Sequence, residues 1–271
     1  MRRLAFTIPA EALETVLDGL LPLVPQGVHW TPADDGTLEL AVYDTAGDLA
    51  SLAALEAVIG PELIASAEEE APDDAVARRL RYRPRVAVAN RVVVRPSGSD
   101  PPGEGVLDVV IDSPRGAFGA GAHPTTSMCL ELLTQLRPGG SFADLGCGAG
   151  VLAITAAMLG WEPVFAVDHE PSGVEATIAN AARNGVDVDA LVADLLQIPP
   201  PPAATIAANV PPAVHEHVAA GLPPEVERVI VSGIVDEYLA EVVAGYEQAG
   251  LAVVERRGGP GWVAALLNRG G

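Results

Sequence analysis

A glycine-rich turn follows a short apolar run at FADLGCGAG, and its residue types are those that let a backbone come close to a nucleotide. The glycines are Gly146, Gly148 and Gly150, and the acid Asp144 stands just before them. Glycine has no side chain and accepts left-handed backbone conformations, so a ligand can approach such a turn closely. A dinucleotide site has the spacing G-x-G-x-x-G, which fails here because position 151 is Val.

Two acids near this turn indicate a ligand with a positive charge. Asp144 would repel a pyrophosphate in a partly dry site. The next apolar run, PVFAVD, ends in Asp168 at about the spacing of an acid that binds ribose hydroxyls. S-adenosylmethionine carries an amine, a sulfonium, a ribose and an adenine, and no phosphate. We therefore expect its methionine end to contact Asp144 and the glycines, and its ribose to contact Asp168. A nicotinamide-dependent oxidoreductase is the alternative.

Two further polar residues end later apolar runs. Asp194 ends LVAD and could meet the adenine amino group or be an ordinary loop acid. Asn209 ends TIAAN and would project from the carboxyl edge of a sheet, where ligands bind in such folds. Methyl transfer to an amine depends mainly on aiming the amine lone pair, which an amide oxygen and a backbone carbonyl can do. Asn209 is thus the expected catalytic residue; alternatively, it caps a turn before Pro211.

A second glycine-rich loop, GAFGAGAHPTT, precedes the first of these apolar runs. With Phe118 and His123 it could form a rim over the methyl donor, and the segment after it predicts an amphipathic helix. We do not expect His123 to act as a base. The remaining histidines share no metal-ligand spacing and the two cysteines, Cys129 and Cys147, cannot form a cluster, so no metal site is expected.

These residues need a parallel α/β sheet to bring them together. From about residue 106 apolar strands alternate with helical segments, which is typical of such a sheet. The first seventy residues follow the order β-α-β-β-α-β, which predicts a small ferredoxin-like α+β domain. We expect a substrate-recognition domain over 1–70, a linker over 71–105 and a methyltransferase domain over 106–271.

Charge and composition restrict the partners. The net charge is −20 and every cation is an arginine, so nucleic-acid binding is not expected and a basic protein partner is. The exception is a cluster of seven arginines between Arg78 and Arg95, interpreted as a solvated linker face; the alternative is a surface that docks to RNA or to an acidic neighbour. No apolar run approaches the roughly 20 residues of a membrane helix. Pro9 and Glu11 interrupt the first apolar stretch, so no signal peptide is predicted. We expect a cytoplasmic monomer.

Several segments together resemble one family, the bacterial ribosomal protein L-eleven methyltransferases. They are AFGAGAHPTT, DLGCGAGVLAI, AVDHEP, NAARNGV, AANV and SGI, and the likeness spans about residues 109–268. It implies a class I methyltransferase, Rossmann-like, with seven strands and the last antiparallel. It implies S-adenosylmethionine as donor, and the N-terminal amine and lysine side chains of a large-subunit ribosomal protein as acceptors.

The resemblance also assigns roles by motif. Thr126 matches a threonine that touches the cofactor, Gly146 the first glycine of its turn, Asp168 the ribose acid and Asn209 the residue at the active-site edge. The family's Asn-(Ile/Leu)-Leu-Ala run appears here as NVPP, and its linker as RYRPRVAVAN. These departures leave the substrate open. The alternatives are a methyltransferase for another protein or a small amine, and a non-catalytic binding protein that keeps the fold.

Overall fold

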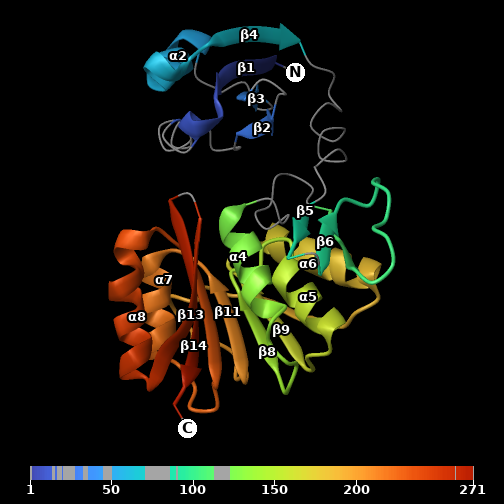
Figure 1. Cartoon of the computed structure of the whole chain (residues 1–271), viewed down its shortest axis with the longest axis vertical. Coiled ribbons are helices and arrows are strands. Elements are labelled where there is room, and N and C mark those ends of the chain that lie inside the picture. Colours follow the sequence, from blue (N-terminus) through green and yellow to red (C-terminus); the bar gives the residue numbers. More distant parts are fainter. Residues whose placement is uncertain are drawn as a thin grey trace. The chain divides into compact units, whose positions relative to one another are not determined.

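The chain forms two compact units in a computed structural model, residues 1–79 and 80–271 (Figure 1). The structure describes residues 2–13, 16, 20, 28–32, 36–44, 51–70, 86–89, 91–112, 123–259 and 261–270. Within that part of the chain, no helix has the length and apolar character needed to cross a membrane. Both cysteines, Cys129 and Cys147, are buried and free.

The second unit is built on one seven-stranded sheet with the order β10-β9-β8-β11-β12-β14-β13. The strands from β10 to β12 are parallel, and β14 is antiparallel to both of its neighbours. This confirms the predicted class I methyltransferase fold with an antiparallel last strand. The strands are β8 (Phe142–Leu145), β9 (Val164–Asp168), β10 (Asp189–Val192), β11 (Thr205–Asn209), β12 (Arg228–Ile234), β13 (Leu251–Gly259) and β14 (Trp262–Arg269).

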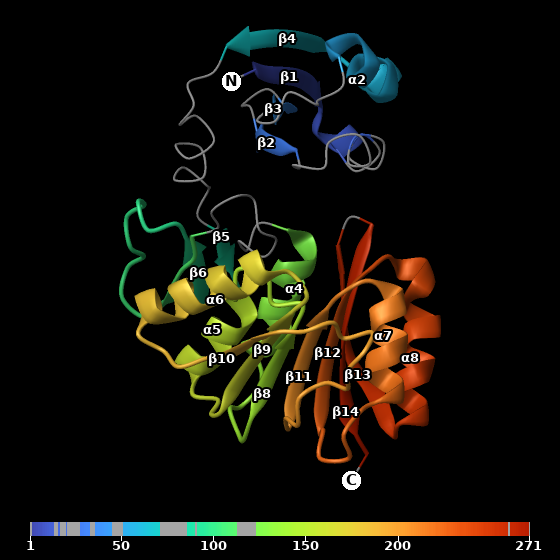
Figure 2. The same ribbon diagram turned by 180° about the vertical axis from the view of Figure 1, so that it is seen from behind.

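Helices cover both faces of this sheet, so its central strands are buried on both faces rather than on alternate residues. One core holds side chains of α4 and α5, and the other those of α7 and α8, on opposite faces of the strands. Figure 2 shows α4, α5 and α6 on one side of the strands and α7 and α8 on the other. The helices are α4 (Pro124–Leu133), α5 (Val151–Leu159), α6 (Pro171–Asn184), α7 (Pro212–Ala220) and α8 (Leu239–Gln248).

Helix boundaries near the glycine turn follow from local chemistry. Helix α5 begins after Gly150 and ends at Gly160, both in the left-handed conformation. Proline at position 171 opens α6, where its missing N–H is no loss, and Gly185 closes that helix. As a result, the N-termini of α5 and α6 directly follow the carboxyl ends of β8 and β9, and β8 pairs on its other side with β11. The order of the strands therefore reverses between β8 and β11, and ligands bind at such a reversal in open α/β sheets.

A small three-stranded sheet precedes α4 in the second unit. It consists of β5 (Val86–Val88), β6 (Val92–Arg95) and β7 (Leu107–Val110), with β6 and β7 parallel. The Arg95 guanidinium binds both oxygens of Asp108 at 2.6 Å. The expected linker over 71–105 therefore differs from the structure in its second half. The cause is the buried run Val92–Val94, which packs into the core around α4 and α5.

The first unit is a four-stranded antiparallel sheet with the order β2-β3-β1-β4. Its core forms where alternate residues of β1 and β3, such as Phe6 and Leu40, meet Leu55 and Ile59 of α2. Ser51 caps that helix. The helix expected after β1 lies largely outside the described residues, so the ferredoxin-like assignment stays a prediction. The elements are β1 (Arg2–Pro9), β2 (His29–Pro32), β3 (Thr37–Asp44), α2 (Leu52–Ile59) and β4 (Ala65–Glu70).

Candidate functional site

The turn after β8 has the open backbone that its glycines predict. Gly146, Gly148 and Gly150 have φ values of 72°, 52° and 84°, in the left-handed region. The amide of Gly146 donates to the Val167 carbonyl at 2.8 Å, which fixes the turn to the neighbouring strand β9. A Cβ on Gly146 would lie 2.6 Å from Val210 Cγ1, so the position has no room for a side chain.

Asp168, the last residue of β9, is bonded directly to this turn. Its Oδ2 accepts a hydrogen bond from the Gly148 amide at 2.8 Å, and its Oδ1 accepts one from the Glu170 amide at 2.9 Å. The carboxylate is thus fixed at the edge of the glycine turn. Each oxygen can still accept from a ligand, because a carboxylate oxygen has two lone pairs.

Asp144 lies deeper and has an unused oxygen. Its Oδ2 accepts the Ala153 amide of α5 at 3.0 Å, whereas its Oδ1 is buried and has no partner among the described residues. Burial raises the pKa of Asp144 to about 7, against the lowering effect of the Ala153 amide, and the charge of Asp168 raises it further. A buried carboxyl in this state is ready to receive a cation or a hydrogen-bond donor.

Asn209 and Thr126 show the same unmet bonding capacity. The Asn209 Oδ1 and the Thr126 Oγ1 are buried without a partner in the part of the chain that the structure describes. Asn209 ends β11, the strand next to β8, in the register that pairs Ala207 with Asp144. Thr126 belongs to the first turn of α4, which packs on β11 and β12. Asp144 is also near this helix, since its charge contributes to the raised pKa of Cys129, one turn after Thr126.

The rim expected before α4 is described only in part. Phe118 and the loop glycines lie outside the described residues. His123 caps α4: its Nδ1 accepts the Thr125 amide at 3.4 Å, and its ring packs edge-on against Trp262 at 5.1 Å. Burial lowers the pKa of His123. The histidine thus has a structural task at the helix start.

Asp194 uses both carboxylate oxygens on its own turn. Its Oδ1 accepts the Leu196 amide at 2.9 Å, and its Oδ2 accepts the Gln197 side-chain amide at 2.8 Å. The Leu196 amide is the main cause of a lowered pKa for Asp194. These contacts fix the Asp194 carboxylate on its own turn and leave each oxygen one lone pair, so contact with the adenine amino group stays a prediction.

Helix α6 holds the glycine turn through residues to which the sequence assigned no role. Thr177 Oγ1 donates to the Gly148 carbonyl at 3.0 Å, and Asn180 Nδ2 donates to the Ala149 carbonyl at 2.9 Å. Asn180 also binds the main chain of Asp112, the residue just before the glycine-rich loop. Gly173 packs closely on the same turn, since a Cβ there would lie 3.3 Å from the Gly148 carbonyl oxygen and 3.4 Å from the Asp168 carboxylate. The sequence feature that pointed to Asn180 was the segment NAARNGV, which begins with this residue and is part of the family resemblance.

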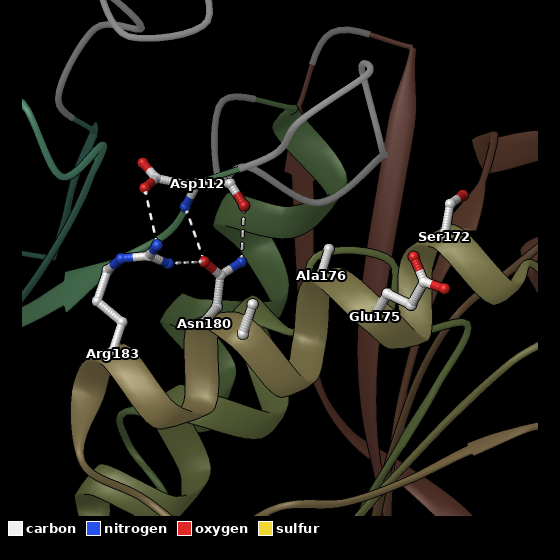
Figure 3. A pocket seen from close by; sticks show the side chains of 7 residues that line it. Asp112, Ser172, Glu175, Ala176, Asn180 and Arg183 are labelled. Atoms are coloured by element: carbon white, nitrogen blue, oxygen red, sulfur yellow. Dashed lines mark hydrogen bonds and ion pairs between the residues drawn. The ribbon is translucent and has the colours of Figure 1, made fainter.

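A shallow hollow opens on the outer side of α6, where Asp112 meets the helix (Figure 3). Arg183 forms an ion pair with Asp112 at 3.3 Å and donates to Asn180 Oδ1 at 2.8 Å. Glu175 and Ser172 line its other end. None of the residues expected to bind the donor lines this hollow, so we assign it no part in the site.

The carboxyl edge of β8, β9 and β11 therefore offers a specific set of contacts. It has a buried carboxyl group, a carboxylate fixed by two amides, an open backbone turn, and an amide oxygen without a partner among the described residues. The described residues contain no group of three or more His, Cys, Asp or Glu side chains that could hold a metal ion. Such a set of contacts can hold two organic molecules side by side at this edge of the sheet.

Comparisons with known proteins agree with this arrangement. Residues 46–269 match the family model described as ribosomal protein L11 methyltransferase (PrmA). A relative with that name from Symbiobacterium thermophilum is 42% identical over 145 residues, which cover 53% of this chain and 46% of the relative. One from Burkholderia lata is 36% identical, covering 65% of this chain and 58% of the relative. One from Methylococcus capsulatus is 34% identical, covering 68% and 69%.

The matched parts thus span about half of the first two relatives. Among solved structures, a ribosomal protein L11 methylase from Lactobacillus delbrueckii subsp. bulgaricus superposes with a TM-score of 0.60 at 22% identity. It covers 69% of this chain and 98% of that protein, and it supports the fold. The family model covers more than half of the chain, and so the chain belongs to the ribosomal protein L11 methyltransferase family.

Proposed function

We propose that the chain is an S-adenosylmethionine-dependent protein N-methyltransferase that acts on the N-terminal amine and lysine side chains of ribosomal protein L11. The observation that carries the proposal is that three of the seven buried side-chain polar atoms without a partner among the described residues lie on elements of this one edge. These atoms are Asp144 Oδ1, Thr126 Oγ1 and Asn209 Oδ1, on elements that meet at the carboxyl edge of the sheet. Buried polar atoms normally have partners, so such a set indicates a ligand.

The residues present fit the donor. Gly146, Gly148 and Gly150 would admit its methionine end, Asp144 would face the cationic amine, Asp168 would accept the ribose hydroxyls, and Thr126 would donate to or accept from the donor. When bound, S-adenosylmethionine supplies an electrophilic methyl carbon on a sulfonium. Asp194 would accept from the adenine amino group, because each of its oxygens keeps a lone pair besides the bond to its own turn.

Asn209 would hold the acceptor amine. A neutral amine has N–H groups to donate and one lone pair, so an acceptor oxygen that binds the hydrogens also sets the direction of the lone pair. The Asn209 Oδ1 is free for this within the described structure and lies at the end of β11, beside the glycine turn. Positioning of this kind can supply much of the rate enhancement in a two-substrate reaction.

The partner proposed is a basic protein. A chain with a net charge of −20 attracts a basic partner over a distance, which speeds encounter more than it adds affinity. The first unit has its own core and is the proposed substrate-recognition domain. We further propose that the protein works in the cytoplasm as a monomer and does not itself bind nucleic acid.

The test is to incubate the protein with S-adenosylmethionine and unmethylated ribosomal protein L11 and to follow the intact mass of L11. We expect mass gains in steps of one methyl group, lost in Asn209→Ala and kept in Gln135→Ala, a surface amide control on the segment after α4. Donor binding without transfer to L11 but with transfer to another amine would replace the substrate. Donor binding without transfer to any amine would indicate a non-catalytic protein, and binding of a nicotinamide dinucleotide instead would indicate an oxidoreductase.

A further inference from the structure

His215 is a buried histidine that the proposed function leaves without a role. It lies on α7, three residues after Pro212 opens that helix, and it is 0% exposed. Its Nε2 is 2.8 Å from the Ser232 carbonyl oxygen, and its Nδ1 is 3.0 Å from the Tyr246 hydroxyl. Both contacts are within hydrogen-bonding distance, so the ring is held from both ends.

The partners of the ring fix where its proton sits. A carbonyl oxygen can only accept, so the hydrogen must be on Nε2, and Nδ1 must accept from the Tyr246 hydroxyl. Burial lowers the pKa of His215 to about 4, against the opposing effect of the Ser232 and Val210 carbonyls. Burial also raises the pKa of Tyr246. Both side chains are therefore neutral near pH 7, and the bonds run in one direction from Tyr246 through His215 to Ser232.

The Ser232 carbonyl is also part of the edge on which Asn209 lies. Its oxygen accepts a second hydrogen bond, from the Val210 amide at 3.1 Å. Asn209 and Ser232 are paired residues of β11 and β12. The pairing of β12 with β14 shifts register between Val231 and Ile234, so this carbonyl lies in an irregular stretch. Such irregularities occur next to active sites, where they redirect a side chain or a backbone group.

Gly233 brings the β12 backbone against the same peptide. Its φ is +83°, and a Cβ there would lie 2.6 Å from the Val210 nitrogen and 3.0 Å from the Asn209 carbonyl carbon. The Asn209–Val210 peptide therefore packs against Gly233, and its N–H is hydrogen-bonded to the Ser232 carbonyl. Any displacement of the Ser232 carbonyl would be transmitted to Asn209.

We propose that His215 and Tyr246 are positioning residues that fix the direction of Asn209 through the Ser232 carbonyl. This rests on the proposed function for its effect on catalysis, while its structural part stands independently. His215 touches neither donor nor acceptor. It acts by holding the carbonyl to which the peptide after Asn209 is bonded.

The matched variants differ in what they offer the Ser232 carbonyl. His215→Leu removes the N–H group that donates to the Ser232 carbonyl, whereas His215→Gln keeps an N–H group of similar reach. Tyr246→Phe keeps the packing of α8 but removes the hydroxyl that donates a hydrogen bond to His215 Nδ1. His217→Gln is the control, an exposed histidine on the same helix. Each variant is compared with the full-length protein.

The first readout is independent of any substrate. We expect hydrogen exchange of the Val210 amide to speed up at least tenfold in His215→Leu and in Tyr246→Phe, and to stay within twofold of the original rate in His215→Gln and His217→Gln. The nitrogen chemical shifts of the His215 ring should show that Nε2 is protonated and Nδ1 is unprotonated. A protonated Nδ1, or unchanged Val210 exchange in folded Tyr246→Phe, would overturn the proposal whatever the protein methylates.

The second readout is the methylation of ribosomal protein L11. We expect kcat to fall at least tenfold in His215→Leu and Tyr246→Phe, with the S-adenosylmethionine affinity within twofold, and most of kcat to return in His215→Gln. A fall in donor affinity equal to the fall in kcat would contradict a role confined to Asn209. If no variant and no original protein methylates L11 while the exchange results hold, the proposed function fails and the positioning network stands.

Discussion

Gly146 and Val210 are in contact across the carboxyl edge of the sheet, so closely that a methyl group on Gly146 would come within 2.6 Å of Val210 Cγ1. The contact joins the turn proposed to hold the donor to the residue that follows Asn209. The proposed donor and acceptor positions are therefore coupled by packing. A change in packing at one of them is expected to reach the other.

The first prediction concerns this contact. Gly146→Ala should lower the free energy of unfolding by about 2–4 kcal/mol, because it combines left-handed strain with a steric clash. Gly185→Ala is the matched control, since Gly185 has a φ of +67° with nothing within 4 Å of an added Cβ. It should cost only about 1 kcal/mol. Urea unfolding measures both.

Adding Val210→Ala to Gly146→Ala should recover part of the loss, because it removes the atom that clashes. We expect a favourable coupling of about 1 kcal/mol in the double-mutant cycle. Strictly additive effects of the two substitutions would show that the contact does not restrict position 146.

The second prediction concerns pH. Burial raises the pKa of Asp144 to about 7 from an ordinary value of 3.8, so the folded protein keeps a proton that the unfolded chain releases earlier. The stability that this protonated form contributes is fully present below about pH 4 and is lost as the pH rises through 7. Relative to Asp144→Asn, the original protein should lose on the order of 3–4 kcal/mol of unfolding free energy between these limits.

Unfolding curves of both proteins at several pH values measure this difference, and the general effect of the acidic surface cancels between them. Affinity for S-adenosylmethionine should rise over the upper part of the same range, because a cationic ligand requires the ionised carboxylate. A pH-independent difference in stability would mean that Asp144 is ionised throughout.

The third prediction concerns the clamp on α6. Asn180→Ala should destabilise the protein by about 2–4 kcal/mol, because it leaves the Ala149 carbonyl and both main-chain groups of Asp112 without their bonds. It should also weaken donor binding, since Ala149 belongs to the glycine turn. Ile178→Ala, at a half-exposed position of the same helix, should change stability by less than about 0.5 kcal/mol. Equal effects of the two would argue against a clamp.

The fourth prediction separates the two units. A chain lacking residues 1–79 should keep its affinity for S-adenosylmethionine, because every described residue proposed to bind the donor lies in the second unit, which has its own cores. Methylation of ribosomal protein L11 should be lost. Calorimetry measures the first quantity and intact mass the second. Loss of both together would contradict the division of labour between the units.

The sequence predicted the edge of the sheet well because its signals are local. Asp144, Asp168 and Asn209 each end an apolar run, and the ends of neighbouring parallel strands must meet at one edge. The glycine turn and the antiparallel last strand followed from spacing and resemblance. What the sequence could not show was which partners these residues use within the fold.

Contacts between distant segments were missed for that reason. Nothing in the strand around Ser232 indicates that its carbonyl is shared by Val210 and His215, since the bond to His215 depends on how α7 packs. Strand β5 was not predicted, because it lies in a segment whose arginines suggested a solvated linker. The contacts of Asp194 with Leu196 and Gln197 could not be predicted from the sequence either.

Titration of the full chain with S-adenosylmethionine, followed by calorimetry, tests the central claim most directly. We predict binding of one donor per chain, weakened roughly ten- to hundredfold by Asp168→Asn, which loses a charged acceptor. Glu170→Gln, an exposed neighbour, should bind as the original protein does. Absence of donor binding, or binding that Asp168→Asn leaves unchanged, would contradict the account.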